Sequence, residues 1–289
     1  RFGADCWSLL FSQKKETVPL MTLEMTGQKD KQKAKVNYFL ELSILIAIVI
    51  TLIPIIWIVI LAFLPNRSII NTDFDFSFWL GNFRELADPS QNFVRQILNS
   101  LTITFGTVIL TLAIGAGSGY SLSKLKPPKW ATIPVFIMAA FLPIVPPITL
   151  VPGIYVTLTN LNLLGSITGL ILVNTVFNLP FAILMIKSYF DQIPEELREA
   201  ALVDGASEKR IFFSVLLPLA KPGFGAVGIY VAIMAWNEFL MGLIMTTGGK
   251  AAPLTVGIAS LVQDYEITFG QMSAAGFVAA IPIIVLTAV

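Results

Sequence analysis

Long apolar runs, almost free of charged residues, place the strongest limit on what this chain can fold into. The first runs from about Tyr38 to Leu64 and is long enough to cross a hydrocarbon core of about 30 Å. Hydrophobic residues make up 55% of the chain and charged residues 13%, whereas soluble domains carry about a quarter charged residues. A water-soluble core cannot bury so much apolar surface. The sequence therefore predicts an all-α integral membrane protein.

The apolar runs predict six transmembrane helices separated by more polar segments. We expect them at about 38–64, 97–122, 130–158, 167–190, 224–245, and from 271 onward. Residues 1–36 are mixed and polar, and we expect an N-terminal segment that is poorly structured in part and carries no cleavable signal peptide. Residues 37–289 form the predicted transmembrane domain. In the second span Gly115, Ala116 and Gly119 indicate close helix packing.

The basic residues favour one orientation in the membrane, because cytoplasmic segments carry an excess of Lys and Arg. With the N-terminus in the cytoplasm, the outer loops hold Arg67, Arg84, Arg95 and Lys250. The inner segments then hold twelve basic residues: Lys29, Lys31, Lys33, Lys35, Lys124, Lys126, Lys129, Lys187, Arg198, Lys209, Arg210 and Lys221. This distribution predicts a multi-pass membrane protein with a cytoplasmic N-terminus.

Several kinds of chemistry are disfavoured by what the sequence lacks. The chain has no histidine and one cysteine, Cys6, so neither a histidine-based catalytic triad nor a thiolate metal cluster is available. We assign no catalytic and no metal-binding residue. A net charge of +1 argues against a nucleic-acid partner. Gly248-Gly249-Lys250-Ala251 is the fragment nearest to a phosphate-binding loop, but it lacks the first glycine and the Ser or Thr of that motif.

A polar segment between the fourth and fifth spans, here called the 191–218 loop, is too charged to cross a membrane. Pro194 suits a first helical turn, and Glu195 and Glu196 follow it at the positive end of a helix dipole. Gly205 permits a turn with positive φ, and Ser207 is a candidate N-cap for a second short helix. The pattern predicts a helix–glycine turn–helix. On this pattern alone an ordinary amphipathic loop and a docking element both remain open.

The same loop resembles the EAA loop of importer permeases in ATP-binding cassette (ABC) transporters. The resemblance rests on Glu199-Ala200-Ala201, Gly205, Val215 and Leu217-Pro218, with Val215 at a position where that family usually has Ile. Asn178-Leu179-Pro180-Phe181, Asp191-Gln192-Ile193-Pro194 and Trp236-Asn237-Glu238-Phe239-Leu240 are similar to the carbohydrate-uptake, maltose-type, binding-protein-dependent branch. The resemblance extends from about Asn99 onward, over about two thirds of the chain.

The resemblance implies a permease subunit of a heteromeric importer for a sugar or glycoside in a prokaryotic inner or plasma membrane, and not an enzyme. Its implied partners are a second homologous permease, two ABC ATPase subunits that hold ATP and Mg²⁺, and an extracytoplasmic solute-binding protein. It implies a cytoplasmic coupling helix–turn–helix that contacts the ATPase through Glu199, Ala200, Ala201, Asp204, Gly205, Leu217 and Pro218. It also implies that the outer loop at Gly248, Gly249 and Lys250 meets the binding protein.

Neutral polar residues near the spans are candidates for the solute path, because sugar sites combine hydrogen-bonding groups with an apolar wall. They are Asn174, Asn178, Trp236 and Asn237. Hydrogen bonding between helices is the alternative use of such residues. The third span contains several prolines, which suit either a kinked packing helix or a helix that lines the path. Both interpretations remain open. Two other functions remain as alternatives: an ABC permease for a non-carbohydrate solute, and a stand-alone secondary transporter. Ion-coupled carriers need charged residues within the membrane, and the spans have few, which disfavours the secondary transporter.

Overall fold

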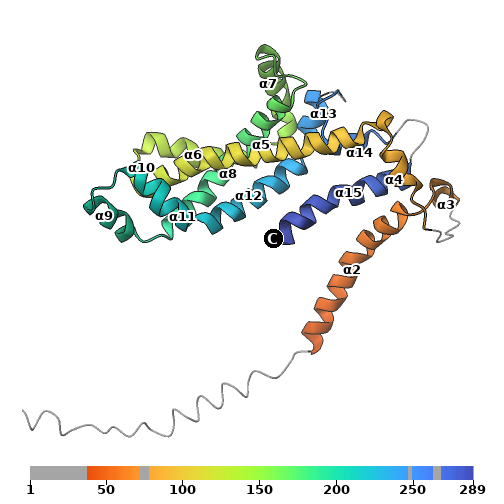
Figure 1. Ribbon diagram of the computed structural model, residues 1–289, viewed down its shortest axis with the longest axis horizontal. Coiled ribbons are helices and arrows are strands. Elements are labelled where there is room, and N and C mark those ends of the chain that lie inside the picture. The colour runs from red at the N-terminus through yellow and green to blue at the C-terminus, as the bar shows by residue number, and fades with distance from the viewer. Residues whose placement is uncertain (1–37, 72–77, 247–248, 263–267, 289) are drawn as a thin grey trace, which may run out of the picture. The chain divides into compact units, whose positions relative to one another are not determined.

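The computed structural model describes residues 38–71, 78–246, 249–262 and 268–288, and the regular elements in these residues are helices (Figure 1). This agrees with the predicted all-α class. The predicted N-terminal segment, 1–36, lies outside the described residues. The chain divides into two compact units, Arg1–Ile56 and Trp57–Val289.

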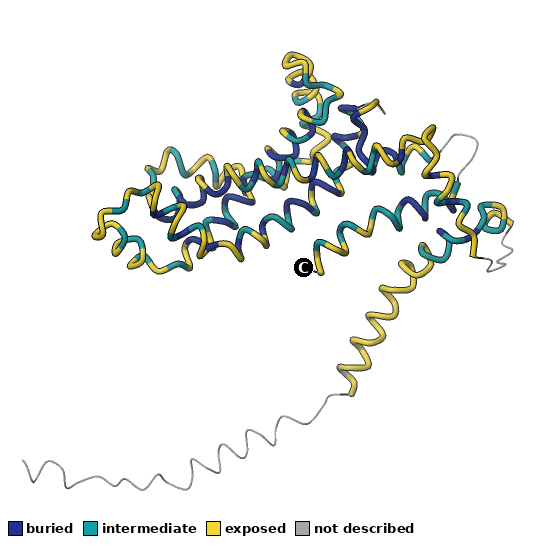
Figure 2. The backbone as a smooth tube through the Cα atoms, viewed as in Figure 1, coloured by how far each residue is buried: buried dark blue, intermediate teal, exposed yellow. Residues whose placement is uncertain are grey.

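Helix α2 (Tyr38–Ala62) supplies all the described residues of the first unit and ends in the second. Its segment Glu41–Ala62 is long and apolar enough to cross a membrane, which confirms a helix at the first predicted span. From residue 41 to residue 56 its side chains are exposed (Figure 2). Exposed aliphatic side chains such as Ile44 and Ile53 suit a lipid surrounding.

Three helices form the centre of the second unit: α5 (Phe93–Tyr120), α8 (Ile167–Asp191) and α12 (Lys221–Trp236). Buried residues run along all three (Figure 2). Small residues let α5 and α8 approach closely, since a Cβ added at Gly119 would lie 2.7 Å from Cγ2 of Ile186. A Cβ added at Gly115 would lie 2.9 Å from Cδ1 of the same residue. The predicted close packing at these glycines is confirmed.

The predicted third and fifth spans are not single helices. The third is split into α6 (Lys129–Phe141) and α7 (Pro147–Asn160). Pro143, Pro146 and Pro147 lie at this break, where missing N–H groups prevent a continuous ladder. The fifth divides into α12 and α13 (Leu240–Thr246). There the Glu238 carboxylate accepts hydrogen bonds from the N–H groups of Met241 and Gly242, at 2.6 and 2.9 Å, so that a new helix starts.

Four helical segments in the described residues are long and apolar enough to span a membrane: Glu41–Ala62, Phe93–Leu125, Ile167–Asp191 and Phe269–Ala288. A fifth is obtained if Glu208–Leu219 and Lys221–Trp236, bent by 75°, count as one span. The predicted total of six thus stays a prediction. Helix α8 begins where its N-cap Ser166 accepts a hydrogen bond from the N–H of Gly169 at 3.0 Å.

Short elements gather around the first residues of α5 and around α15 (Phe269–Ala288). They are α3 (Asn66–Ile70), α4 (Gly81–Leu86), η2 (Pro89–Gln91) and α14 (Leu254–Ala259). Buried Asn82 joins α4 to the last turn of α2, because its Nδ2 donates to the carbonyl oxygens of Ala62 at 2.9 Å and Leu64 at 2.8 Å. Phe83 and Phe277 pack edge to face beside it.

The 191–218 loop and the end of α5 complete the second unit. The loop contains α9 (Glu195–Val203), α10 (Glu208–Ile211), the π-helical turn η4 (Phe212–Leu216) and the start of α11 (Leu217–Leu219). Helix α5 continues into a second π-helical turn, η3 (Ser121–Leu125). In Figure 1, α9 and α10 lie at the end of the second unit away from α4.

Candidate functional site

Helix α9 ends in the glycine turn that the sequence predicts. Gly205 has φ of 79°, and its N–H donates to the carbonyl of Leu202 at 3.0 Å. The N–H of Ala206 donates to the carbonyl of Ala201 at 3.0 Å, which completes a Schellman motif. Ser207 stands at the N-cap position of α10 with an extended backbone, but its side chain makes no capping hydrogen bond.

A cluster of charged side chains fastens the two short helices of the loop to each other and to α5. The guanidinium of Arg198 on α9 contacts Glu195 at 3.0 Å and is also paired with Glu208 on α10. The hydroxyl of Tyr120, at the end of α5, donates to the same Glu208 carboxylate at 2.5 Å. One carboxylate therefore joins α5, α9 and α10.

The π-helical turn η3 makes a second attachment, at the entry to the loop. Buried Lys124 donates through Nζ to the carbonyl of Ile193 at 2.7 Å and lies 3.3 Å from Glu195. The hydroxyl of Ser123 donates to Asp191 at 2.6 Å. Lys187 pairs with the other oxygen of Asp191 at 2.5 Å. A π-turn directs consecutive side chains differently from a regular α-turn, and such turns are frequent at functional sites.

These contacts favour the charged forms of the groups in the loop. Partial burial opposes ionisation of Glu195, yet hydrogen bonds from Lys124 and Arg198 hold the pKa of its carboxyl below the usual value. The hydrogen bond to Glu208 raises the pKa of Arg198 above that of a free guanidinium. The loop is thus held by ionised partners near neutral pH.

Apolar side chains of the loop pack beneath this polar cluster. Ile211 and Leu216 are fully buried with Phe190 against the helices of the second unit. The rings of Tyr120 and Phe212 lie with centroids 5.0 Å apart, and those of Tyr120 and Phe190 5.7 Å apart. Aromatic pairs at such distances add about 0.5–1.5 kcal/mol each beyond their buried area. The loop is therefore a packed part of the helical body.

We expect Arg198→Met to loosen the loop, because it removes the cation between Glu195 and Glu208 while keeping most of the side-chain volume. The carboxylates are about one-third exposed, so the loss is about 1–2 kcal/mol. This corresponds to a fall of about 2–8 °C in the apparent Tm of the detergent-solubilised protein. Arg210→Met, at an exposed position on α10, is the matched control. Equal Tm values for the two variants would contradict the assigned role of Arg198.

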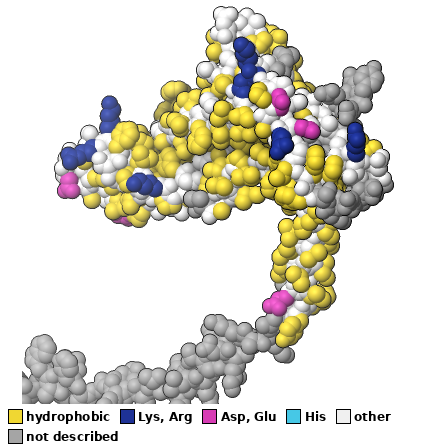
Figure 3. Space-filling view, turned by 45° about the vertical axis from the view of Figure 1, so that its right-hand side comes forward, with side chains coloured by type: hydrophobic (Ala, Val, Ile, Leu, Met, Phe, Trp, Pro, Cys, Tyr) yellow, Lys and Arg dark blue, Asp and Glu magenta, His cyan; other side chains and the backbone are white. Residues whose placement is uncertain are grey.

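The opposite face of the loop is open. Glu199, Ala200, Asp204, Gly205 and Pro218 are exposed, whereas Ala201 and Leu217 are half-buried. Apolar side chains also stand outward here, with Val203 88% and Phe213 63% exposed. On the face of the molecule in Figure 3, hydrophobic side chains cover much of the surface and charged ones gather in a few groups. The exposed face of the loop thus presents two carboxylates, Glu199 and Asp204, beside small and apolar residues.

Each candidate solute residue makes a hydrogen bond within this chain. Asn174 and Asn178 are buried on α8, where each Nδ2 donates to the carbonyl four residues earlier, at 2.9 and 2.8 Å. Trp236 is buried, and its Nε1 donates to the carbonyl of Ala279 at 3.1 Å. Asn237 is exposed and bonds to Ile233 at 2.8 Å. The solute role of these residues stays a prediction.

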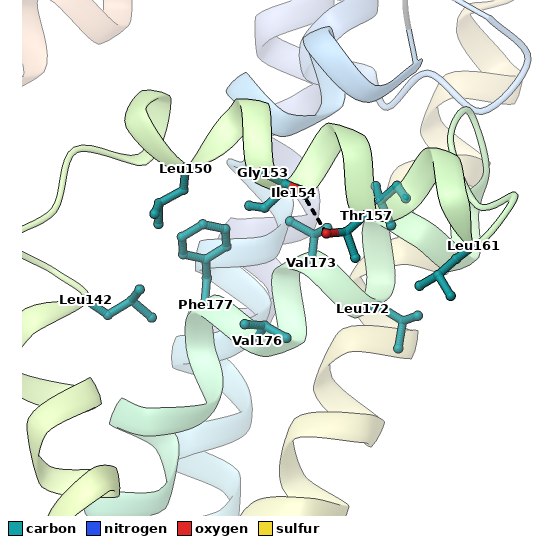
Figure 4. A pocket seen from close by; sticks show the side chains of 11 residues that line it. Leu142, Leu150, Gly153, Ile154, Thr157, Leu161, Leu172, Val173, Val176 and Phe177 are labelled. Carbon is teal, nitrogen blue, oxygen red and sulfur yellow. Dashed lines mark hydrogen bonds between the residues drawn. The ribbon is translucent and has the colours of Figure 1, made fainter.

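An apolar pocket of about 420 Å³ lies among the end of α6, α7 and α8 (Figure 4). Phe177, Val173 and Val176 of α8 face Leu150 and Ile154 of α7 across it. Its one lining hydroxyl, on Thr157, donates to the carbonyl of Gly153 at 2.8 Å. Such a lining offers little hydrogen bonding to a hydroxyl-rich solute.

The candidate binding-protein loop is attached to the start of α5. Gly249 and Lys250 are exposed, and Gly248 lies outside the described residues. Nδ2 of buried Asn99 donates to the carbonyls of Lys250 and Ala252, both at 2.9 Å. The hydroxyl of Ser100 accepts a hydrogen bond from the N–H of Leu254 at 2.8 Å. These contacts fix the loop from position 250 to position 254.

Sequence reasoning missed the residues that hold both loops. The sequence places Lys124 only among the basic residues of the inner segments and indicates no role for Tyr120, Asn99 or Ser100. Their partners lie between 69 and 154 residues away along the chain. No local pattern connects positions so far apart. For Lys124 the sequence offers one signal, which is its position directly after a long apolar run.

Comparison with known proteins places this site in context. Residues 109–289 match the family described as the inner membrane component of binding-protein-dependent transport systems. A diacetylchitobiose uptake system permease protein of Streptomyces coelicolor is 32% identical over 241 residues, 82% of this chain and 79% of the relative. A trehalose/maltose transport system permease protein of Thermococcus litoralis is 30% identical over 247 residues, 84% of this chain and 88% of the relative.

A solved structure supports the fold. It is that of a bacterial ABC transporter involved in the import of the acidic polysaccharide alginate, and one of its chains matches with a TM-score of 0.71. The match covers 89% of this chain and 96% of the other at 22% identity. The EAA motif from Glu199 to Pro218 lies within the family match. The chain belongs to the family of inner membrane components of binding-protein-dependent transport systems, as a permease component of an ABC importer.

Proposed function

We propose that this chain is one of two permease subunits of an ATP-driven importer for a sugar or glycoside, and that it forms half of the translocation path. The observation that supports this proposal most directly is the structure of the 191–218 loop. Its exposed face presents Glu199 and Ala200, whereas Arg198 and Lys124 hold its other face by ion pairs and hydrogen bonds. Such an element can receive force without deforming. Separate ATPase subunits, which bind ATP and Mg²⁺, dock on the exposed face and drive the change between inward-facing and outward-facing states.

The sugar assignment rests on the chemistry of the relatives and of the spans. Two relatives are named for diacetylchitobiose and for trehalose and maltose, all uncharged, hydroxyl-rich glycosides. Apart from Lys124, which bonds to the 191–218 loop, the buried polar side chains between Asn99 and Asn178 are neutral. This favours an uncharged solute over an anion. A second permease supplies the other half of the path, and an extracytoplasmic binding protein delivers the solute to the outer loop.

The deciding experiment combines copurification with uptake. The tagged chain, expressed with the products of its neighbouring genes, should copurify with a second permease and two ATPase subunits. In vesicles that complex should take up radiolabelled trehalose or diacetylchitobiose only with internal ATP and external binding protein. Competition by an amino acid or phosphate, without competition by any glycoside, would favour a non-carbohydrate solute. Uptake by vesicles that hold this chain alone would overturn the proposal in favour of a secondary transporter.

Cysteine labelling tests the proposed orientation, with six spans and a cytoplasmic N-terminus. In vesicles without the ATPase subunits, and in a Cys6→Ser background, Asp204→Cys should react with a membrane-impermeant maleimide only when the vesicles are inside-out. Lys250→Cys should react only in right-side-out vesicles, because both side chains are exposed and the loops lie on opposite sides. Labelling of both from one side would contradict the orientation. Labelling of neither, with normal labelling after solubilisation, would place both positions inside the assembly and contradict an open docking face.

A further inference from the structure

Helix α5 touches both loops that face partners in the proposed assembly. At its outer end Asn99 and Ser100 hold the backbone from Lys250 to Leu254 by hydrogen bonds of 2.8–2.9 Å. Helix α14 also packs tightly here, since a Cβ on Gly257 would lie 1.9 Å from Oε1 of Gln96. The position of the outer loop therefore follows that of α5.

The inner end of α5 is fastened equally firmly to the 191–218 loop. Tyr120 bonds to Glu208 at 2.5 Å, and Lys124 in η3 bonds to the carbonyl of Ile193 at 2.7 Å. Both side chains are buried, at 5% and 7% exposure. A displacement of α9 or α10 that keeps these contacts must carry the end of α5 with it.

The stretch between these two attachments is well suited to transmit a displacement. From Asn99 to Lys124 the helix spans about 37 Å at 1.5 Å per residue. Prolines interrupt the other described helices long enough to span a membrane: Pro54 in α2, Pro180 in α8 and Pro282 in α15. None lies between Phe93 and Leu125. Proline is a main cause of kinks, so α5 lacks the proline kinks of the other three helices, and its Gly115 and Gly119 are packed against Ile186.

The middle of α5 has few directional bonds to its surroundings. The hydroxyls of Thr104, Thr107 and Thr111 are buried and have no hydrogen-bond partner among the described residues. The small residues Gly115 and Gly119 face the aliphatic side chain of Ile186. Van der Waals packing of this kind resists separation of α5 and α8 but opposes a small axial shift less than hydrogen bonds would.

We propose that α5 is a strut that couples the outer loop at 249–254 to the 191–218 loop, so that a nucleotide-driven change at one alters the other. The inference rests on the proposed function, because it needs an ATPase at the inner loop. Asn99, Ser100, Tyr120 and Lys124 act as positioning residues at the two ends. Coupling through a shared element is reciprocal, so a protein docked at 249–254 also biases the inner loop.

The test follows the outer loop while the nucleotide state changes on the inner side. In the purified complete complex, with Cys6→Ser and Lys250→Cys, the maleimide labelling rate is measured with and without Mg-ATP plus vanadate. Vanadate trapping should change this rate by at least about fivefold, the lower range of allosteric couplings. In Lys124→Met or Tyr120→Phe, which alter only the far end of α5, the change should fall below about twofold.

Matched controls separate coupling from general damage. Lys129→Met replaces an exposed lysine close to the inner end, and Thr102→Ala removes an exposed hydroxyl that bonds within α5; both should keep the full nucleotide effect. An unchanged effect in Lys124→Met and Tyr120→Phe would overturn the strut. So would a labelling rate that vanadate does not alter in a complex that hydrolyses ATP. A chain that recruits no ATPase would instead refute the proposed function itself, which ATP hydrolysis by the purified sample reports separately.

Discussion

Glu199→Lys is expected to abolish solute uptake while the protein still inserts in the membrane. Glu199 is exposed on α9, so its replacement disturbs no packing within the chain. At a docked interface a reversed charge faces groups that pair with a carboxylate, and such mismatches cost about 2 kcal/mol or more, equivalent to about thirtyfold in affinity. The expected result is at least about a thirtyfold loss in ATPase-subunit affinity, with ATP-driven uptake at background. Pull-down of the ATPase and vesicle uptake assays measure the two effects.

Two further variants show whether the effect belongs to this carboxylate. Glu199→Gln keeps the shape without the charge and should be intermediate. Glu196→Lys makes the same change of net charge on the same helix, at an exposed position outside the EAA motif, and should retain most uptake. If Glu199→Lys docks and transports normally, the 191–218 loop is not the ATPase contact. If Glu196→Lys is equally inactive, the effect is one of overall charge and the assignment of Glu199 is wrong.

Local chemistry was sufficient to predict much of the loop that carries this residue. Gly205 is placed where a positive φ ends a helix, and Glu195 and Glu196 mark the start of that helix. Helices at four of the predicted spans follow from length and hydropathy alone. These features depend on residues within about one or two turns of each other, which a sequence displays directly.

The breaks in the third and fifth spans were harder to predict, for different reasons. The prolines of the third span, which include Pro143, Pro146 and Pro147, indicate a kink, but hydropathy favours one continuous run. The break after Trp236 has no proline, and it depends on the Glu238 carboxylate turning back onto Met241 and Gly242. Glutamate is not a usual cap, so its position gave no warning. In both cases the chemistry of a few neighbouring residues decides a boundary that average hydropathy does not resolve.

The contacts of α5 were beyond sequence reasoning because they are long-range. Tyr120 and Glu208 are 88 residues apart, and Asn99 and Ala252 are 153 apart. Each residue alone suits an ordinary helix end or packing position. The π-helical turn η3, which carries Ser123 and Lys124, has no sequence signature in this stretch. A fold-level match shows the helices but not which side chains join them.

Substitutions at Gly205 should reduce coupling in an order set by backbone conformation and not by side-chain size. A Cβ at this position meets nothing within 4 Å, while φ is 79°, so the expected cost is that of the left-handed region. Asn tolerates that region best, Ala loses about 1–2 kcal/mol, and a β-branched Val loses more. Gly205→Pro should be the most severe, because proline fixes φ near −65° and removes the N–H that bonds to Leu202.

The predicted order of ATP-driven uptake is therefore Gly, Asn, Ala, Val and Pro, with the proline variant at background and unable to retain the ATPase subunits. Gly165 provides the matched control, since it has φ of 71°, open space for a Cβ, and an N–H bonded to Met245 at 2.9 Å. It joins α7 to α8, away from the 191–218 loop. Gly165→Ala should lower the apparent Tm about as much as Gly205→Ala but leave ATPase retention intact.

If both alanine variants release the ATPase equally, loss of stability explains the effect and the loop has no special part in coupling. If size rather than φ sets the order, so that Gly205→Ala exceeds Gly205→Asn in activity, the left-handed turn is not what the docked state requires.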